Sequence, residues 1–235
     1  MLPIAILAGG LATRLRPLTE ALPKALIEVD GEPFAFHQLR LLRRRGIEQV
    51  VYCVGYRGEQ VAEAVGDGAR FGLGVRYSFD GPALLGTAGA LRAALSLLGT
   101  DFFVLYGDSF LDCDYGQVEH AYRQAGRPAL MTVFRNDRKW DTSNVEFGDG
   151  RIIAYSKAHP TERMRHIDYG LGVFASRALA IVPTDRPTDL AAIYERLAAA
   201  NELAAFEVSQ RFYEVGSLAG LAQFEDYLRK RAQAK

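Results

Sequence analysis

Short apolar segments that alternate with helical patterns constrain the fold of this chain more than any other feature of its sequence. Four segments are rich in β-branched and aromatic residues, as buried strands are: 3–7, 49–55, 74–79 and 101–108. Helical patterns lie between them, and the first, 34–46, has apolar residues on one face and four arginines on the other. This order predicts a mainly parallel sheet covered by helices.

The second half of the chain has a different pattern, in which strands predominate. Segments 128–136, 143–156, 166–176 and 203–216 favour strands, and 143–156 favours a hairpin that turns at 148–150. Segments 189–201 and 217–235 favour helices, and the last of these has a basic end. We expect one domain over 1–235, with a core at 1–127, a β-rich part at 128–174, and completion of the core by 175–235.

Charge and composition exclude several classes of protein. The chain has 28 basic and 28 acidic residues, so its overall charge favours neither a nucleic-acid nor a membrane partner. No apolar run approaches the roughly 18 residues that span a bilayer, and no secretory signal is apparent. Two cysteines, Cys53 and Cys113, are too few for a disulfide framework, and the four histidines have no catalytic or zinc-binding spacing. We expect a cytoplasmic protein.

The turn after the first apolar segment combines small residues with positive charge. Leu7 and Ala8 end the strand and Gly9 and Gly10 follow, so backbone N–H groups can converge on phosphate oxygens. The side chains that follow are a hydroxyl and three cations that can neutralise a polyphosphate: Thr13, Arg14, Arg16 and Lys24. The Walker A pattern is absent. By spacing alone, an ordinary strand-to-loop turn is the alternative.

The segment from Leu7 to Phe34 resembles the signature of the sugar-1-phosphate nucleotidyltransferases, the nucleotide-sugar pyrophosphorylases. That pattern is L-A-G-G-x-G-T-R-L-x-P-L-T, followed by P-K and V-x-G-x-P, and the agreement extends over the whole segment. The resemblance implies that Gly9, Gly10 and Thr13 hold a triphosphate. It also implies that Arg14 stabilises the leaving pyrophosphate and that Lys24 bridges the phosphates. Ala12 departs from the pattern, because the family has glycine there.

Two features downstream concern the base of the nucleotide. The segment from Leu84 to Leu95 is similar to the family's P-L-G-T-A/G-G-A-L, which implies that the backbone around Gly86 and Thr87 meets the nucleotide. A helix with Thr87 as its N-cap is the alternative. Asp80 precedes this segment and can accept a hydrogen bond from a ring N–H of uracil, thymine or guanine, and a solvated turn aspartate fits the sequence equally well.

Asp108 follows the fourth apolar segment, at the end of a strand where open α/β sheets bind their ligands. A carboxylate there can hold a hard cation against phosphate oxygens, and a turn-capping aspartate is the alternative. The resemblance implies Mg²⁺ on Asp108. It places Glu214, in the segment from Arg211 to Leu221, where the family has a second metal-binding aspartate. An exposed glutamate on an edge strand is the alternative for Glu214.

The resemblance places the acceptor site in the β-rich part. It implies that Lys157 contacts the sugar phosphate and aligns Gly170 with a family glycine, whereas Ser156 and the pair Asp168–Tyr169 differ from the family. Trp140 fits either the lining of this pocket or a packing role. The acceptor-site candidates are Asn144, Lys157, Asp168 and Gly170.

The resemblance implies a Rossmann-like, GT-A-like three-layer α/β sandwich with a mixed, mostly parallel sheet. It also implies a reaction of a nucleoside triphosphate with a sugar 1-phosphate that releases pyrophosphate. The acceptor phosphate is already ionised, so no general base is required. The candidate catalytic residues are Arg14, Lys24, Asp108 and Lys157.

The short chain is most similar to two subgroups of this family, the manno-heptose-1-phosphate guanylyltransferases and the N-acetylmuramate-1-phosphate uridylyltransferases. Two alternatives remain open. One is a CTP-dependent transfer to a non-sugar phosphate or phosphonate, and the other is a catalytically silent subunit that binds nucleotide sugars. The closing helix is a candidate contact for a homodimer.

Overall fold

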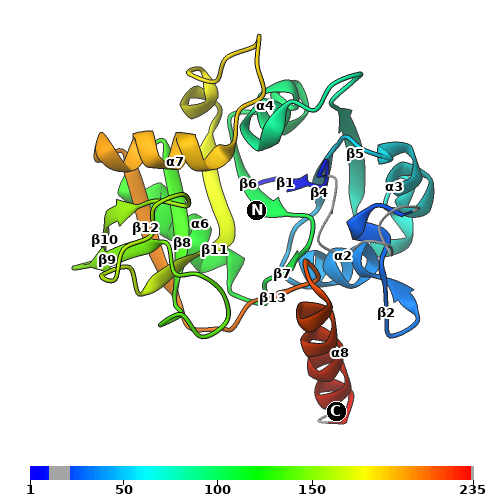
Figure 1. Cartoon of the computed structure of the whole chain (residues 1–235). Helices are drawn as coiled ribbons and strands as arrows, with labels where there is room; N and C mark the ends of the chain where they lie inside the picture. The colour runs from blue at the N-terminus through cyan, green and yellow to red at the C-terminus, as the bar shows by residue number, and fades with distance from the viewer. Residues whose placement is uncertain (11–21, 234–235) are drawn as a thin grey trace.

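The computed structural model describes residues 1–10 and 22–233, and within them nine strands form one mixed sheet. Its first half is parallel (Figure 1): β1 (Ile4–Leu7) pairs with β4 (Gln49–Val54) and β6 (Asp101–Tyr106), and β4 pairs with β5 (Gly74–Phe79). These are the four segments that composition predicts as buried strands. The carboxyl ends of β1, β4 and β6 therefore meet at one edge of the sheet.

The second half of the sheet is mostly antiparallel. The strand β11 (His166–Ala175) is antiparallel to β6 and also to β8 (Ala129–Arg135), so it connects the two halves. Beyond it lie β9 (Val145–Gly148) and β10 (Arg151–Tyr155), the predicted hairpin, and β12 (Leu203–Val208), which is parallel to β8. The β-rich part is thus a continuation of the same sheet.

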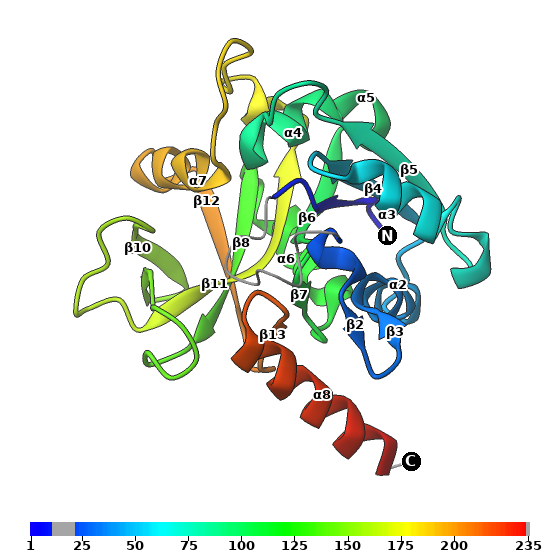
Figure 2. The ribbon, with the colours of Figure 1, turned by 45° about the vertical axis from the view of Figure 1, so that its right-hand side comes forward.

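Helices cover both faces of the sheet, because alternate residues of each strand face opposite sides. Ile4 and Ile6 pack with α2 (Phe34–Arg44), α3 (Gly58–Val65) and α6 (Tyr115–Ala125). Ala5 and Leu7 belong to the core that contains α4 (Gly86–Ala93), α5 (Leu95–Leu98) and α7 (Leu190–Ala199). In Figure 2, α4, α5 and α7 lie above the sheet and α2 lies below it. The expected three-layer α/β sandwich is confirmed.

A third, smaller core fixes the C-terminal helix α8 (Leu218–Gln233), which extends away from the sheet (Figure 1). Its buried Phe224 packs against Phe34 of α2 and Phe110 of β7 (Ser109–Phe110), with ring centroids 5.4 and 4.8 Å away. Two-residue strands complete this region: β13 (Tyr213–Glu214) pairs with β7, and β2 (Glu28–Val29) pairs with β3 (Glu32–Pro33). The remaining short elements are η2 (Lys24–Leu26), η3 (Ala69–Phe71) and η4 (Ser176–Leu179).

Three details differ from what the sequence pattern indicates. The helical segment that ends at Gly99 is divided at Ala94 into α4 and α5. The helix α6 lies in a stretch for which the pattern predicts no element. Thr87 is not an N-cap, because α4 already begins at Gly86 and the Thr87 hydroxyl accepts a hydrogen bond from the backbone N–H of Leu190. A further finding is that none of the helices in residues 22–233 is long and apolar enough to cross a membrane.

Replacing the buried ring that attaches α8 should destabilise the protein. Phe224→Ala leaves a cavity among the surrounding aromatic rings, and we expect it to lower the free energy of unfolding by about 3 to 5 kcal/mol. Leu218→Ala on the same helix is the control, since that side chain is 65% exposed and its loss should change the free energy by at most about 0.5 kcal/mol. Urea unfolding of both variants measures the difference, and equal stabilities would contradict the packing described.

Candidate functional site

A cavity of about 240 Å³ lies where β1, β4 and β6 end. Residues of the first turn line this cavity together with Asp80 and Asp108. Of the residues that the sequence predicts, these line it: Leu7, Ala8, Gly9, Gly10, Lys24, Asp80, Gly86, Thr87 and Asp108. Thr13 and Arg14, with Ala12 and Arg16, lie outside the described residues. The predicted nucleotide-binding residues that the structure describes, both before residue 11 and after residue 21, thus line one cavity.

The first turn is held between two neighbouring strands by its backbone. The N–H of Ala8 donates to the carbonyl of Cys53 at 2.8 Å, and the N–H of Gly107 donates to the carbonyl of Leu7 at 2.9 Å. A Cβ atom at Gly9 would lie 3.2 Å from the backbone nitrogen of Gly55, and one at Gly107 would lie 2.9 Å from the Leu7 carbonyl oxygen. Backbone packing therefore requires glycine at 107 and leaves little room for a side chain at Gly9.

An ion pair that the sequence pattern does not reveal lies in this cavity. Lys24 Nζ is 2.8 Å from Asp108 Oδ2, and the two side chains are only 21% and 22% exposed. Both residues were predicted as ligands of the triphosphate and its metal. In the structure the two side chains form an ion pair with each other.

The structure also brings Glu214 next to Asp108. Glu214 pairs with Ser109 in the β13–β7 ladder, and the N–H of Val215 donates to the carbonyl of Asp108 at 2.9 Å. Glu214 is partly buried rather than exposed on an edge. In the described part of the chain no three His, Cys, Asp or Glu side chains are grouped closely enough to hold a metal. A metal here would need phosphate oxygens or water in addition to these two carboxylates.

Asp80 and Gly86 also line the cavity, and Asp80 lies beside the first turn, because a Cβ atom at Gly9 would be 3.4 Å from Asp80 Oδ2. Asp80 Oδ2 accepts a hydrogen bond from the N–H of Leu85 at 3.2 Å, and burial raises the pKa of this carboxyl although the hydrogen bond opposes the shift. Asp80 is thus a partly buried wall residue and not a solvated turn residue. Gly86 has φ +73°, and a Cβ there would lie 2.5 Å from the carbonyl oxygen of Thr188. This position therefore requires glycine.

Asp189 is a residue of this region that the sequence analysis missed. Its Oδ1 accepts hydrogen bonds from the Thr87 hydroxyl at 3.3 Å and from the N–H of Ala191 at 2.9 Å, where it caps α7. Its Oδ2 is 3.6 Å from Lys157 Nζ. Asp189 thus connects a predicted nucleotide-binding residue with the predicted acceptor lysine. The capping role could have been read from the sequence, but the two long-range contacts could not.

The other acceptor candidates lie together on β11 and in the loop before β9. Asn144 Oδ1 accepts a hydrogen bond from the N–H of Asp168 at 2.9 Å, and Asp168 Oδ1 accepts one from the N–H of Gly170 at 3.0 Å. Gly170 has φ +96°, and a Cβ there would be 3.5 Å from the ring of Tyr106, which lines the cavity. Asn144, Asp168 and Gly170 are therefore adjacent to the cavity wall, behind Tyr106.

Trp140, for which the sequence allows either a pocket-lining or a packing role, packs against another side chain in the structure. Its indole ring stacks on the guanidinium of Arg211, whose Cζ is 3.4 Å from the ring centroid, and the side chain remains 46% exposed. The ring is not among the residues that line the cavity. Trp140 therefore joins its loop to the segment that precedes β13.

Burial raises the pKa of Asp168 to about 6, and the Gly170 N–H and the charge of Lys157 oppose the shift. The same carboxylate raises the pKa of nearby Tyr106 and Tyr155, which burial already raises. A partly protonated carboxyl group among tyrosines can both donate and accept hydrogen bonds near neutral pH. That property suits the recognition of hydroxyl groups.

Neutralising Asp168 should stabilise the fold above pH 6. The folded chain holds this proton up to about pH 6 and the unfolded chain only to about pH 4. Folding therefore becomes less favourable as the pH rises from 4 to 6. Asp168→Asn should gain about 1 to 3 kcal/mol at pH 7.5 and clearly less at pH 5.

Thermal unfolding at both pH values tests this expectation. Asp185→Asn, a change of an exposed aspartate, is the control and should differ little from the unsubstituted chain at either pH. An Asp168→Asn advantage that does not depend on pH would refute the assignment.

The sequence of this chain is similar to those of known nucleotidyl transferases. The family model described as nucleotidyl transferase matches residues 4–227. Glucose-1-phosphate thymidylyltransferase from Streptomyces antibioticus is 35% identical over 165 residues, which are 68% of this chain and 44% of that protein. N-acetylmuramate alpha-1-phosphate uridylyltransferase from Neisseria meningitidis serogroup B is 39% identical over 111 residues, 47% of this chain and 48% of that protein. The chain spans about half the length of the curated relatives it matches.

Solved structures agree with the fold. A Bacillus anthracis protein solved in complex with sucrose superposes with a TM-score of 0.85 at 21% identity, over 97% of this chain and 96% of that chain. Such a likeness concerns the arrangement of strands and helices and not the ligand. Since the family match runs from the first strand into the last helix, the chain belongs to the nucleotidyl transferase family.

Proposed function

We propose that this chain transfers a nucleotidyl group from a nucleoside triphosphate to a sugar 1-phosphate and releases pyrophosphate. The observation that carries the proposal is that Gly9, Lys24 and Asp108 line the same cavity as Asp80 and Gly86. The cavity thus brings together a turn suited to phosphates, a cation, a carboxylate and a group suited to a base. The names of the two relatives, which act on glucose 1-phosphate and N-acetylmuramate 1-phosphate, support this substrate class.

In this proposal the reaction depends on positioning. The acceptor phosphate supplies an ionised oxygen that attacks the α-phosphorus, and pyrophosphate leaves in line. Fixing the two substrates can contribute on the order of 7 to 11 kcal/mol, so a rigid cavity is needed more than a reactive side chain. Lys24 and Arg14 would stabilise charge on the phosphates, and Lys157 would hold the acceptor phosphate. Asp189, which contacts both Lys157 and Thr87, would align the two substrates.

We further propose that Mg²⁺ is the cofactor and that Asp108 and Glu214 hold it. Carboxylate oxygens are the ligands that this ion prefers, and the two residues lie on paired regions of β7 and β13. When bound, the ion would neutralise charge on the phosphate oxygens. Asp108 would exchange Lys24 for that cation, and the released ammonium of Lys24 would be free to contact the triphosphate. The existing ion pair fits this exchange, because it holds both side chains inside the cavity that the first turn lines.

The proposal includes a cytoplasmic location, where nucleoside triphosphates are made. It includes no nucleic-acid or membrane partner, because the chain has equal numbers of acidic and basic residues. The extended helix α8, with Leu218 65% exposed, is the candidate contact for a homodimer.

A substrate matrix tests the proposed reaction. We expect pyrophosphate release when ATP, CTP, GTP, UTP and dTTP are each combined with a panel of sugar 1-phosphates and Mg²⁺. A preference for UTP, dTTP or GTP would support a hydrogen bond from a ring N–H to Asp80, because these three bases have a ring N–H, whereas adenine and cytosine offer only exocyclic amino donors. Release only with CTP and phosphocholine would favour the non-sugar alternative. Nucleotide binding without release from any pair would favour a silent subunit.

Removing either member of the cavity ion pair should stop the reaction. Asp108→Ala should abolish detectable turnover, because it removes a proposed ligand of the metal. Lys24→Ala should lower kcat by about 100-fold or more, because it removes a cation that would stabilise charge on the phosphates. Asp226→Ala and Lys230→Ala, which break an exposed ion pair on α8, are the matched controls and should keep most of the activity. Rates of pyrophosphate release provide the comparison, and wild-type turnover in Asp108→Ala would exclude the metal assignment.

A further inference from the structure

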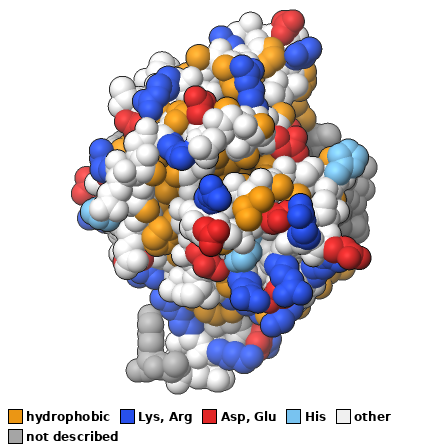
Figure 3. Space-filling model, turned by 90° about the vertical axis from the view of Figure 1, so that its left-hand side faces the viewer, with side chains coloured by type: hydrophobic (Ala, Val, Ile, Leu, Met, Phe, Trp, Pro, Cys, Tyr) orange, Lys and Arg blue, Asp and Glu red, His pale blue; other side chains and the backbone are white. Residues whose placement is uncertain are grey.

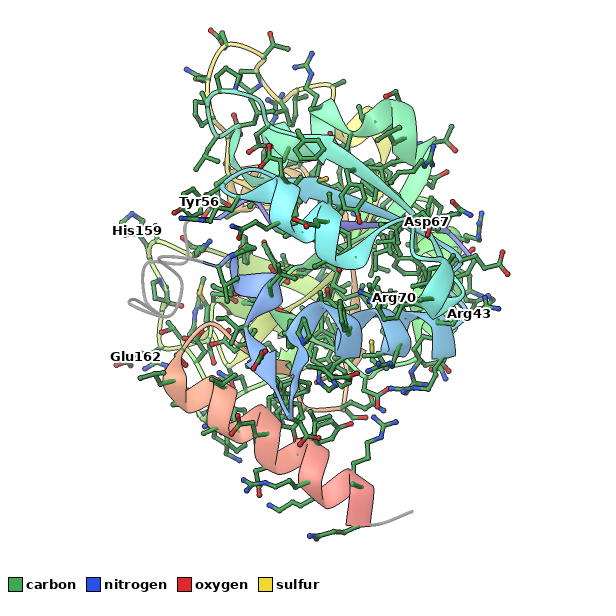
Figure 4. All side chains as sticks on the ribbon, turned by 90° about the vertical axis from the view of Figure 1, so that its right-hand side faces the viewer. Arg43, Tyr56, Asp67, Arg70, His159 and Glu162 are labelled. Atoms are coloured by element: carbon green, nitrogen blue, oxygen red, sulfur yellow. The ribbon has the colours of Figure 1, made fainter. Side chains whose placement is uncertain are left out.

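We propose that a second hollow, on the face formed by α2 and η3, binds a small anion that carries two phosphate groups. The hollow has a volume of about 440 Å³ and shares no lining residue with the nucleotide cavity. Its cations are Arg40, Arg43 and Arg44 of α2 and Arg70 of η3, and the rings of Phe36 and Phe71 line it as well. We refer to it as the arginine hollow. Figure 4 looks onto this face and labels Arg43 and Arg70.

The positive charge in the arginine hollow is only partly compensated. Glu32, its one acidic lining residue, is occupied by Arg40, which donates to both carboxylate oxygens. Arg43 is 3.9 Å from Glu48, whose side chain is 79% exposed. Arg44 and Arg70 have no ion-pair partner in the described part of the chain.

Arg70 is held in place before any ligand arrives. Its guanidinium lies over the ring of Phe36, 4.0 Å from the centroid, and over that of Phe71, 4.6 Å from the centroid. One of its nitrogens also donates to the backbone carbonyl of Ala64. These contacts restrict the side chain, so less conformational entropy is lost when its remaining N–H groups bind an anion.

Arg44 adds a second argument, because its surroundings disfavour its charge. Burial and the neighbouring charge of Arg231 lower its pKa, and Asp112 only partly opposes them. Asp112 is already bound by Arg45 and Arg231, which hold α8 and the end of α2 in place. The arginines with this structural role thus have a carboxylate partner, whereas Arg44 has none. A bound anion would supply the missing partner.

Phosphate is the chemistry that fits this arrangement best. A planar guanidinium donates pairs of hydrogen bonds that match phosphate oxygens, and the two cation groups, on α2 and on η3, can each take one phosphate. The site is local, since basic and acidic side chains are interspersed on the face shown in Figure 3 and the chain as a whole is neutral. A bounded hollow on a neutral protein favours a small ligand over a nucleic acid or a membrane surface.

Titration with inorganic pyrophosphate, followed by amide NMR without metal, tests the proposal. Amide signals of residues 68–72 and 40–46 should shift with the pyrophosphate concentration in the unsubstituted chain. Arg44→Gln and Arg70→Gln should each weaken this response by about tenfold or more, because each removes a charged hydrogen-bond donor. Arg196→Gln, a change of an exposed arginine on α7, is the matched control and should leave the response unchanged.

The same NMR titration also defines the results that would contradict the proposal. Signals of residues 68–72 that stay in place at millimolar pyrophosphate would overturn it, as would equal affinities in Arg44→Gln, Arg70→Gln and Arg196→Gln. Loss of the response in both hollow variants, with their other signals preserved, would support it. Because these signals lie outside the nucleotide cavity, the outcome does not depend on whether the proposed transfer reaction occurs.

Discussion

The backbone packing around the end of β1 is the constraint on which the rest of the site depends. The backbone of Ala8 and Leu7 is hydrogen-bonded to Cys53 and Gly107 on either side, and close packing leaves no room for a side chain at Gly107 and little at Gly9. With the turn fixed in this way, its N–H groups and the following cation must lie at the edge where β4 and β6 also end. The cavity is thus a consequence of parallel pairing in the core, and its position would be lost if β1 paired differently.

The ion pair between Lys24 and Asp108 places a positive and a negative charge side by side in the cavity. Two opposite charges at 2.8 Å, each about one fifth exposed, are stable only as long as both remain present. Removing one would leave an uncompensated charge in a partly buried cavity, whereas a ligand that brings phosphates and a cation together can replace both partners at once. The pair therefore favours a ligand that carries both signs of charge over a simple anion or a simple cation.

The sequence could predict what depends on local composition. The strands of the parallel half were identifiable because β-branched and aromatic residues cluster there, and the first turn because its glycines and cations are contiguous. Contacts between distant residues were not predictable: Lys24 and Asp108 are 84 positions apart, and Thr87 and Asp189 are 102 apart. The same is true of Thr87, whose hydroxyl suits an N-cap locally but is taken by the N–H of Leu190.

The C-terminal helix is linked to the cavity through very few contacts. The N–H of Val215 bonds the carbonyl of Asp108, and Val215 itself is buried in the small core that Phe224 completes. A shift of α8 would therefore move β13, and with it Glu214, relative to Asp108. Phe224 lies far from the cavity in sequence and carries no polar group. Even so, its ring packs against Tyr213 of β13, with ring centroids 6.1 Å apart, and so supports the two-residue strand that carries Glu214.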